Sequence, residues 1–339
     1  MVRKGRLELP RVAPLDPKSS ASTNSATFAA NGRHYSRDGV SGRTASPPEQ
    51  SSQGSLDKPA CAAIGYHRDM IGIFRGWRRR RILARRSIPE AIWKKTVSDI
   101  PAISVLDANA LERLRALALV FLHEKSLEPA GGLELDDAMR TRIAALACRP
   151  LLGLSLDYYD NFLSVIVYPE EFLVRNRESV DEAGVVHTRD EILSGEAWDQ
   201  GPVILAWQDV DASGRGDGYD VVAHECAHKL DLLEGDMNGG PPLNRGMRAN
   251  EWTESFQTAY DDLIRRLDRG EEPWLDPYAA EEPAEFFAVC TEMFFDVPVA
   301  FFDEYPEIYA QLAAFFRQDP ARSLDRIVRD RSSYSSSAR

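Results

Sequence analysis

The sequence predicts an α+β domain, and three observations lead to this fold class. Helical patterns of apolar residues come first, runs typical of strands follow in the middle, and long helical patterns return toward the end. The composition is that of a globular protein, with 43% hydrophobic and 28% charged residues in a chain of 339 residues. Helices that flank a few strands are typical of α+β domains, so we expect a small mixed sheet packed on helices.

The helical N-terminal part of this domain is expected to begin with residues 89–100. Asp107 can cap the next helix, because its short acidic side chain directly precedes the apolar pattern of residues 108–125. A third helix is expected from Asp136, where apolar residues again recur on one face.

Strand patterns and further helices follow. Runs rich in β-branched and apolar residues predict strands at residues 163–168, 185–187 with 192–193, and 202–207. Helical patterns then cover residues 219–233, 249–269, 283–295 and 306–318. We therefore expect one folded domain over residues 88–325.

Both ends of the chain differ from this domain. Residues 1–69 hold few large apolar residues, so burial cannot offset the entropy lost on ordering them, and we expect a disordered arm. A protein translated from Met70 would lack this arm. Residues 326–339 are rich in serine and predict a flexible tail.

Residues 70–87 form a basic lead-in segment between the arm and the domain. Its sequence, MIGIFRGWRRRRILARRS, combines arginines with large apolar residues. Such a segment can rest on an anionic membrane surface or on a partner, or it can be a solvated approach to the domain. The sequence leaves these alternatives open.

The charge distribution excludes one class of partner. Residues 1–86 carry 17 Lys and Arg and 6 Asp and Glu. Residues 87–339 carry 24 Lys and Arg and 47 Asp and Glu, which gives this part of the chain a net charge of −23. Direct binding of nucleic acid needs clustered basic residues on the folded part of a protein. We therefore expect no direct contact with nucleic acid.

Three features predict a cytoplasmic protein. The chain has no apolar run of the roughly 18 residues that suggest a transmembrane helix. Its first 30 residues lack the apolar core of a secretory signal. The four cysteines include no C-x-x-C pair and are typical of reduced thiols.

The main functional signal is H-E-x-x-H at residues 224–228. On a helix, residues four apart share a face, so the imidazoles of His224 and His228 can reach one ion. Glu225 can then act as a general base on water without being a ligand. The neighbouring residues are apolar on nearly every side of the helix, and buried His and Glu are costly unless they bind a metal or are paired. The alternative is two satisfied core histidines beside a surface glutamate.

A catalytic zinc site needs a third protein ligand, and a downstream carboxylate is the best candidate. The candidates are Glu251, Glu254, Glu281, Glu282, Glu285 and Glu292. Glu285 is modestly favoured because it lies in the first turn of an apolar helix that Pro283 begins. Glu292 lies seven residues on, roughly on the same face, and is expected to hydrogen-bond a ligating histidine. Each can also be an ordinary helix-start or surface carboxylate.

Two segments resemble a known family. H-E-C-A-H-K-L-D at residues 224–231 and Y-A-A-E-E-P-A-E-F-F-A-V at residues 278–289 are similar to the Mlc titration factor A peptidases, and more distantly to the catalytic domain of anthrax lethal factor. The resemblance covers about residues 75–325. It implies a zincin-like metallopeptidase domain with one Zn²⁺ ion per chain.

The resemblance also implies roles for individual residues. Glu285 matches the third ligand of the family, and Tyr278 matches a tyrosine that faces the zinc and donates a hydrogen bond to the oxyanion. Taken alone, Tyr278 is more simply a half-buried loop residue. Val289 stands where lethal factor has a carboxylate that supports a ligand, so Glu292 or Asp231 is expected to supply that support.

Two functions follow as alternatives. One is a gluzincin-type peptidase, with an aminopeptidase among the options, whose peptide or protein substrate would pair with the strand over residues 201–207. The other is a binding factor that sequesters a transcriptional repressor of the Mlc type and so regulates glucose uptake genes. The two can coexist, and the complete H-E-x-x-H favours retained catalysis.

Overall fold

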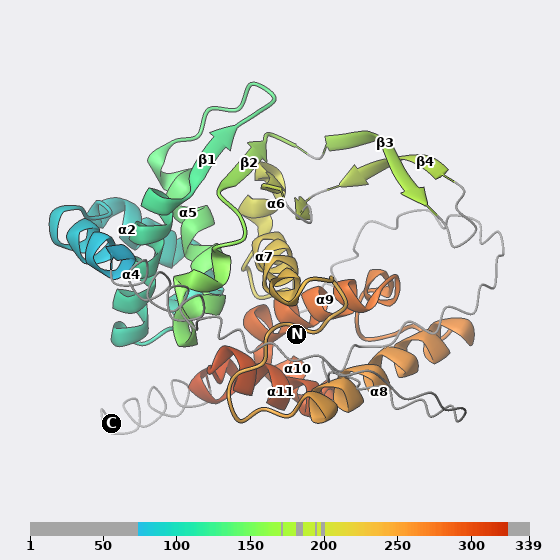
Figure 1. The fold of residues 1–339 in the computed structure, drawn as a ribbon. Coiled ribbons are helices and arrows are strands. Elements are labelled where there is room, and N and C mark those ends of the chain that lie inside the picture. Colours follow the sequence, from blue (N-terminus) through green and yellow to red (C-terminus); the bar gives the residue numbers. More distant parts are fainter. Residues whose placement is uncertain (1–73, 171, 181–185, 194, 198–200, 325–339) are drawn as a thin grey trace, which may run out of the picture.

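The computed structural model describes residues 74–324 except 171, 181–185, 194 and 198–200 (Figure 1). The expected arm over residues 1–69 and the tail over residues 326–339 lie outside the described residues. Helices flank a small mixed sheet, which confirms the α+β class. No helix within the described ranges combines the length and apolar character that crossing a membrane requires.

The N-terminal helices follow the expected order. A helix over residues 74–85 is followed by α2 (Glu90–Asp99), α3 (Pro101–Ser104), α4 (Ala108–Glu124) and α5 (Asp137–Cys148). The side chain of Asp107 accepts a hydrogen bond from the Ala110 N–H, and that of Asp136 accepts one from the Met139 N–H. Both caps satisfy N–H groups that have no partner within the helix. The Asp107 cap agrees with the prediction, and the third helix begins at Asp136 as its apolar pattern predicts.

The sheet has the strand order β1 (Ser126–Pro129), β2 (Ser164–Tyr168), β6 (Val203–Ala206), β5 (Gly195–Ala197). The first three strands are parallel, and β5 runs antiparallel to β6. A separate antiparallel hairpin consists of β3 (Phe172–Val180) and β4 (Val186–Leu193). The strand expected to receive a substrate, β6, has a neighbour on each side, so the expectation that it pairs with a substrate is wrong. The edge position belongs to β5.

The second half of the chain is mostly helical. Its elements are α6 (Trp207–Ala212), α7 (Val221–Asp231), α8 (Ala249–Asp268), α9 (Pro283–Asp296), α10 (Pro298–Glu304) and α11 (Pro306–Phe316). Short 3₁₀ helices are η1 (Pro150–Gly153), η2 (Leu156–Tyr159), η3 (Leu232–Glu234) and η4 (Pro277–Ala280). The motif helix α7 packs against β5 and β6 on one side and against α9 on the other (Figure 1).

Aromatic side chains hold α9 in place. Trp252 and Phe256 of α8 stack with ring centroids 4.3 Å apart, and both contact Phe287 of α9. All three rings are buried. Burial of one such side chain contributes roughly 1.5–3 kcal/mol. Because α9 is fixed on this side, its other side presents carboxylates to α7 at defined positions.

The helix over residues 74–85 is attached to the body by ion pairs. The guanidinium of Arg79 donates to both carboxylate oxygens of Glu124 on α4, at 2.9–3.2 Å, and to Asp157 at 2.8 Å. Arg75 donates to Asp157 and Asp160. This part of the basic lead-in segment is therefore a helix docked on the body by one side, with most of its other side chains exposed.

Candidate metal centre

The start of α7 is held by three acidic side chains. Asp220 caps the helix by accepting hydrogen bonds from the N–H groups of Val222 and Ala223. The preceding loop is fixed by Asp296, whose carboxylate accepts from two glycine N–H groups at 2.7–3.0 Å. The Asp220 N–H itself donates to Glu292 of α9 at 2.7 Å. The motif helix thus begins at a position set by α9.

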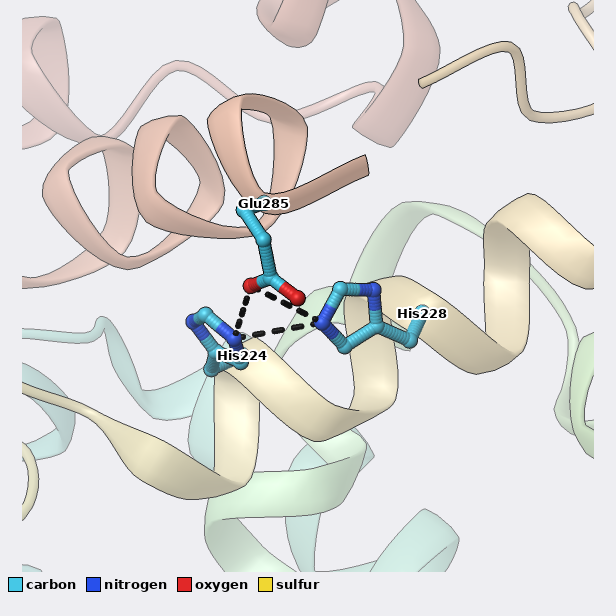
Figure 2. A group of neighbouring side chains, drawn as sticks. All are labelled: His224, His228 and Glu285. Atoms are coloured by element: carbon cyan, nitrogen blue, oxygen red, sulfur yellow. Dashed lines mark hydrogen bonds and ion pairs between the residues drawn. The ribbon is translucent and has the colours of Figure 1, made fainter. Parts of the chain in front are cut away.

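Three side chains of the expected ligand set converge at one point, as Figure 2 shows. His224 and His228 project from α7, one turn apart, and Glu285 reaches them from the first turn of α9. The Oε2 atom of Glu285 lies 3.0 Å from His224 Nε2 and 3.4 Å from His228 Nε2. The two Nε2 atoms are 3.2 Å apart.

These distances test whether the three residues fit a metal ion. Ligand atoms about 2.0–2.1 Å from a tetrahedral zinc ion lie about 3.3–3.4 Å from one another. The three observed separations, 3.0, 3.2 and 3.4 Å, are close to that spacing. Two imidazole nitrogens and one carboxylate oxygen are also donors that suit a borderline metal ion. The cluster is therefore compatible with a metal site that uses one atom from each residue.

Glu292 supports this cluster through a hydrogen bond to His224. Its Oε1 accepts a hydrogen bond from Nδ1 of His224 at 2.9 Å, while its Oε2 accepts the Asp220 N–H. The imidazole of His224 is thus held between two carboxylates, with Glu285 at Nε2 and Glu292 at Nδ1. A donor interaction at Nδ1 fixes the ring orientation and directs Nε2 toward Glu285, where it could act as a ligand atom.

The charges in the cluster depend on one another. Burial alone would lower the pKa of His224, but the hydrogen bonds to Glu285 and Glu292 raise that pKa well above its usual value. Burial would raise the pKa of Glu285, but the hydrogen bonds to His224 and His228 outweigh it and hold that pKa far below its usual range. In the absence of a metal, a protonated His224 between two carboxylates keeps the buried charges paired.

Glu225 and Tyr278 lie next to the three ligand candidates. Glu225 is on α7 and only 4% exposed, and its charge is close enough to affect the pKa values of both His224 and Tyr278. Tyr278 is on η4, 42% exposed, with its ring centroid 6.1 Å from that of His224. Burial, the charge of Glu285 and a hydrogen bond to that carboxylate raise the pKa of Tyr278. The phenol therefore stays protonated and can donate a hydrogen bond near the ligand candidates.

Asp231 lies apart from this arrangement. Its two carboxylate oxygens accept hydrogen bonds from the N–H groups of Gly239 and Gly240, at 2.7 and 2.8 Å. Within the part of the chain that the structure describes, Nδ1 of His228 has no hydrogen-bond partner. Of the two carboxylates expected to support a ligand, Glu292 hydrogen-bonds a histidine of the cluster, whereas Asp231 anchors the loop after α7. Burial raises its pKa to about 6.

Two carboxylates that hold the site were not singled out from the sequence. Asp220 had a readable signal, because an acidic residue directly before an apolar helix is a preferred cap. Asp296 had none, since its partners lie about 80 residues earlier in the chain. Of the other histidines, His123 is on α4, where its Nδ1 contacts the Leu119 carbonyl.

Comparison with known proteins agrees with this geometry. The model of the family described as glucose-regulated metallo-peptidase M90 matches residues 74–317. A protein named Mlc titration factor A from Enterobacter sp. (strain 638) is 36% identical over 245 residues, which cover 71% of this chain and 92% of that protein. Proteins of the same name from Salmonella arizonae and Escherichia coli O8 are 37% and 36% identical over 235 and 236 residues, covering 69% of this chain and 93% and 88% of theirs.

Proposed function

Because this chain belongs to the glucose-regulated metallopeptidase M90 family, we propose that it is a zinc-dependent peptidase of the gluzincin type with a zincin-like catalytic domain. The observation that carries the proposal is the convergence of His224, His228 and Glu285 at separations close to those of tetrahedral zinc ligands. We assign these three residues as the ligands of one Zn²⁺ ion per chain. A bound zinc ion would lower the pKa of water to about 7 and polarise the scissile carbonyl.

The chain's own residues then divide the remaining tasks. Glu225 accepts the proton of the attacking water and passes it to the leaving amine, as a buried general base beside the ligands can do. Tyr278 donates a hydrogen bond to the oxygen on which negative charge develops, and its raised pKa keeps that donor proton in place. Glu292 holds His224 in the orientation that directs Nε2 toward Glu285.

We propose that the substrate backbone pairs with β5. This strand lies at the edge of the described sheet and packs against α7, so a peptide added beside it would run past the motif helix. Backbone pairing gives affinity with little dependence on side chains, so the substrate class is an extended peptide or an extended segment of a protein.

A peptidase assay tests the proposal. The wild-type protein, loaded with zinc, is compared with Glu225→Gln and with Glu254→Gln, an exposed glutamate of α8. Loss of a general base costs about 10²- to 10⁴-fold in rate, so only Glu225→Gln should lose activity. Amino-acid anilides and N-acetylated peptides as substrates would separate aminopeptidase from endopeptidase action. Zinc-independent hydrolysis, or equal rates for wild type and Glu225→Gln, would refute the assignment.

A second candidate function is binding of a transcriptional repressor of the Mlc type. It is supported by the name of the similar proteins, Mlc titration factor A, of whose length the alignments cover 88–93%. Binding does not require the general base, so the Glu225→Gln variant should retain the repressor while it loses peptidase activity. A repressor-binding assay with wild type and Glu225→Gln therefore separates the two functions. If Glu225→Gln loses repressor binding together with peptidase activity, the two functions are not independent.

A further inference from the structure

The helix over residues 74–85 presents two different faces. Residues spaced three and four apart share one side of a helix. One side carries Arg75, Arg79 and Ile82, which are partly buried, and the adjacent side, about 100° around the axis, carries the exposed residues Phe74, Trp77, Arg78, Arg81 and Arg85. We call the second set the outer face.

The inner side fixes how the helix is oriented. Arg79 and its partner Glu124 are largely buried, at 17% and 13% exposed, and Arg75 adds contacts to Asp157 and Asp160. Ile82 packs against the hydrophobic core. Contacts at both ends of the inner side prevent rotation of the helix about its axis, so the outer face is held toward solvent.

The outer face is both apolar and basic. Phe74 and Trp77 are 66% and 51% exposed, with ring centroids 5.9 Å apart, and the guanidinium of Arg81 lies 5.5 Å from the Trp77 ring centroid. Arg78, Arg81 and Arg85 are exposed, and within the described part of the chain none of them forms an ion pair. Large exposed aromatic side chains beside unpaired arginines are unusual on a surface that contacts only water.

We propose that the outer face binds the surface of a membrane that contains anionic lipids. The arginines would contact lipid phosphates, while Phe74 and Trp77 would enter the boundary between headgroups and acyl chains, the position that aromatic residues prefer. The helix is attached at the edge of the body, so it can lie flat on a membrane (Figure 1). Nucleic-acid binding needs clustered basic residues on the folded body, whereas residues 87–339 carry a net charge of −23, so a contact limited to this one helix face favours a lipid surface.

Vesicle flotation with the full-length chain tests this surface. Vesicles of phosphatidylcholine alone are compared with vesicles that also contain phosphatidylglycerol. The double variant Arg78→Glu with Arg81→Glu should weaken binding to the anionic vesicles by roughly tenfold or more, since each basic residue near such a surface contributes a severalfold increase in binding. A charge-matched control reverses two exposed arginines of the α8 end, Arg265→Glu with Arg269→Glu, and should leave binding nearly unchanged.

The aromatic contribution has its own variant and control. Phe74→Ser with Trp77→Ser should weaken anionic-vesicle binding severalfold, while Phe302→Ser, an exposed phenylalanine of α10, should not. All seven positions changed in these variants are exposed, so thermal unfolding should stay close to wild type in each variant. Three outcomes would each overturn the proposal. The two charge-reversal variants lose vesicle binding equally, vesicle binding survives both outer-face variants, or the protein binds duplex DNA and not vesicles. Survival would assign the binding to another surface or to the residues before 74.

Discussion

Exchange of Glu285 for glutamine should abolish tight zinc binding, whereas the same exchange at Glu292 should only weaken it. Both glutamates belong to α9 and both contact His224, but at opposite nitrogens: Glu285 at Nε2 and Glu292 at Nδ1. Only the first of these carboxylates also lies within 3.4 Å of His228. The prediction therefore separates a metal ligand from a residue that positions one, with the same chemical change on the same helix.

The magnitudes follow from the contacts. Zinc binding by four ligands is worth about 10–16 kcal/mol, or roughly 3 kcal/mol for each, so the loss of one ligand should cost about 100- to 1,000-fold in affinity. Glu292→Gln keeps the size of the side chain but has only one oxygen for two donors, the Asp220 N–H and the His224 Nδ1–H. The loss of such a supporting partner typically costs about 10- to 100-fold.

Competition with a chromophoric chelator at neutral pH measures both affinities. Glu225→Gln is the matched control, because it changes a neighbouring buried carboxylate that is not in the ligand cluster and should retain zinc. Circular dichroism shows whether each variant remains folded. If Glu292→Gln loses the metal while Glu285→Gln keeps it, the ligand assignment is refuted.

Three further predictions concern protons, packing and the loop before α7. Because the pKa of His224 is raised, its imidazolium stabilises the metal-free protein fully below pH ~6.5, and this stabilisation is lost as pH rises through the raised pKa. Zinc binding near pH 7 should therefore release about one proton, which calorimetry in two buffers measures. The absence of proton release would contradict the raised pKa. Gly153→Ala should cost about 3 kcal/mol or more in a denaturant titration, because its Cβ would lie 2.1 Å from the Phe316 carbonyl oxygen. At Gly76, within a helix, an added Cβ would make only an ordinary contact, 3.9 Å from Arg80 Nη2, so Gly76→Ala should cost nothing, and equal effects of the two changes would contradict the packing. Asp296→Ala should lower the free energy of unfolding by about 2–4 kcal/mol, since it leaves two glycine N–H groups without their acceptor, and a thermal melt unchanged from wild type would show that the loop does not depend on it.

The sequence predicted the elements whose signals are local. Three helix starts are readable from a few neighbouring residues and agree with the structure. They are the starts at Asp107 and Asp136 and the start of α9 at Pro283. β1 was missed, because in its four residues only Leu127 is buried and pairing with β2 defines the strand. A local pattern carries no information about a partner elsewhere in the chain.

The candidate site shows the same limit. The H-E-x-x-H spacing predicts two side chains on one face, and the structure brings His224 and His228 together with Glu285. The second contact of Glu292, to the Asp220 N–H, joins residues 72 apart and could not be read from spacing. The docking of Arg79 on Glu124 across 45 residues is similar, since a run of arginines does not reveal which of them face the body.

The placement of the ligand candidates on two helices makes a bound ion a cross-link as well as a cofactor. His228 and Glu285 are 57 positions apart in the sequence, and the segment between them includes the loop after α7, the whole of α8 and η4. An ion shared by α7 and α9 would join the two ends of this segment in the folded protein. Because the site is not formed in the unfolded chain, the ion would stabilise the folded state by its binding free energy, about 10–16 kcal/mol for a structural zinc site. Chelation should therefore resemble the reduction of a disulfide, with α8 and the loop after α7 becoming the first regions to exchange their amide hydrogens.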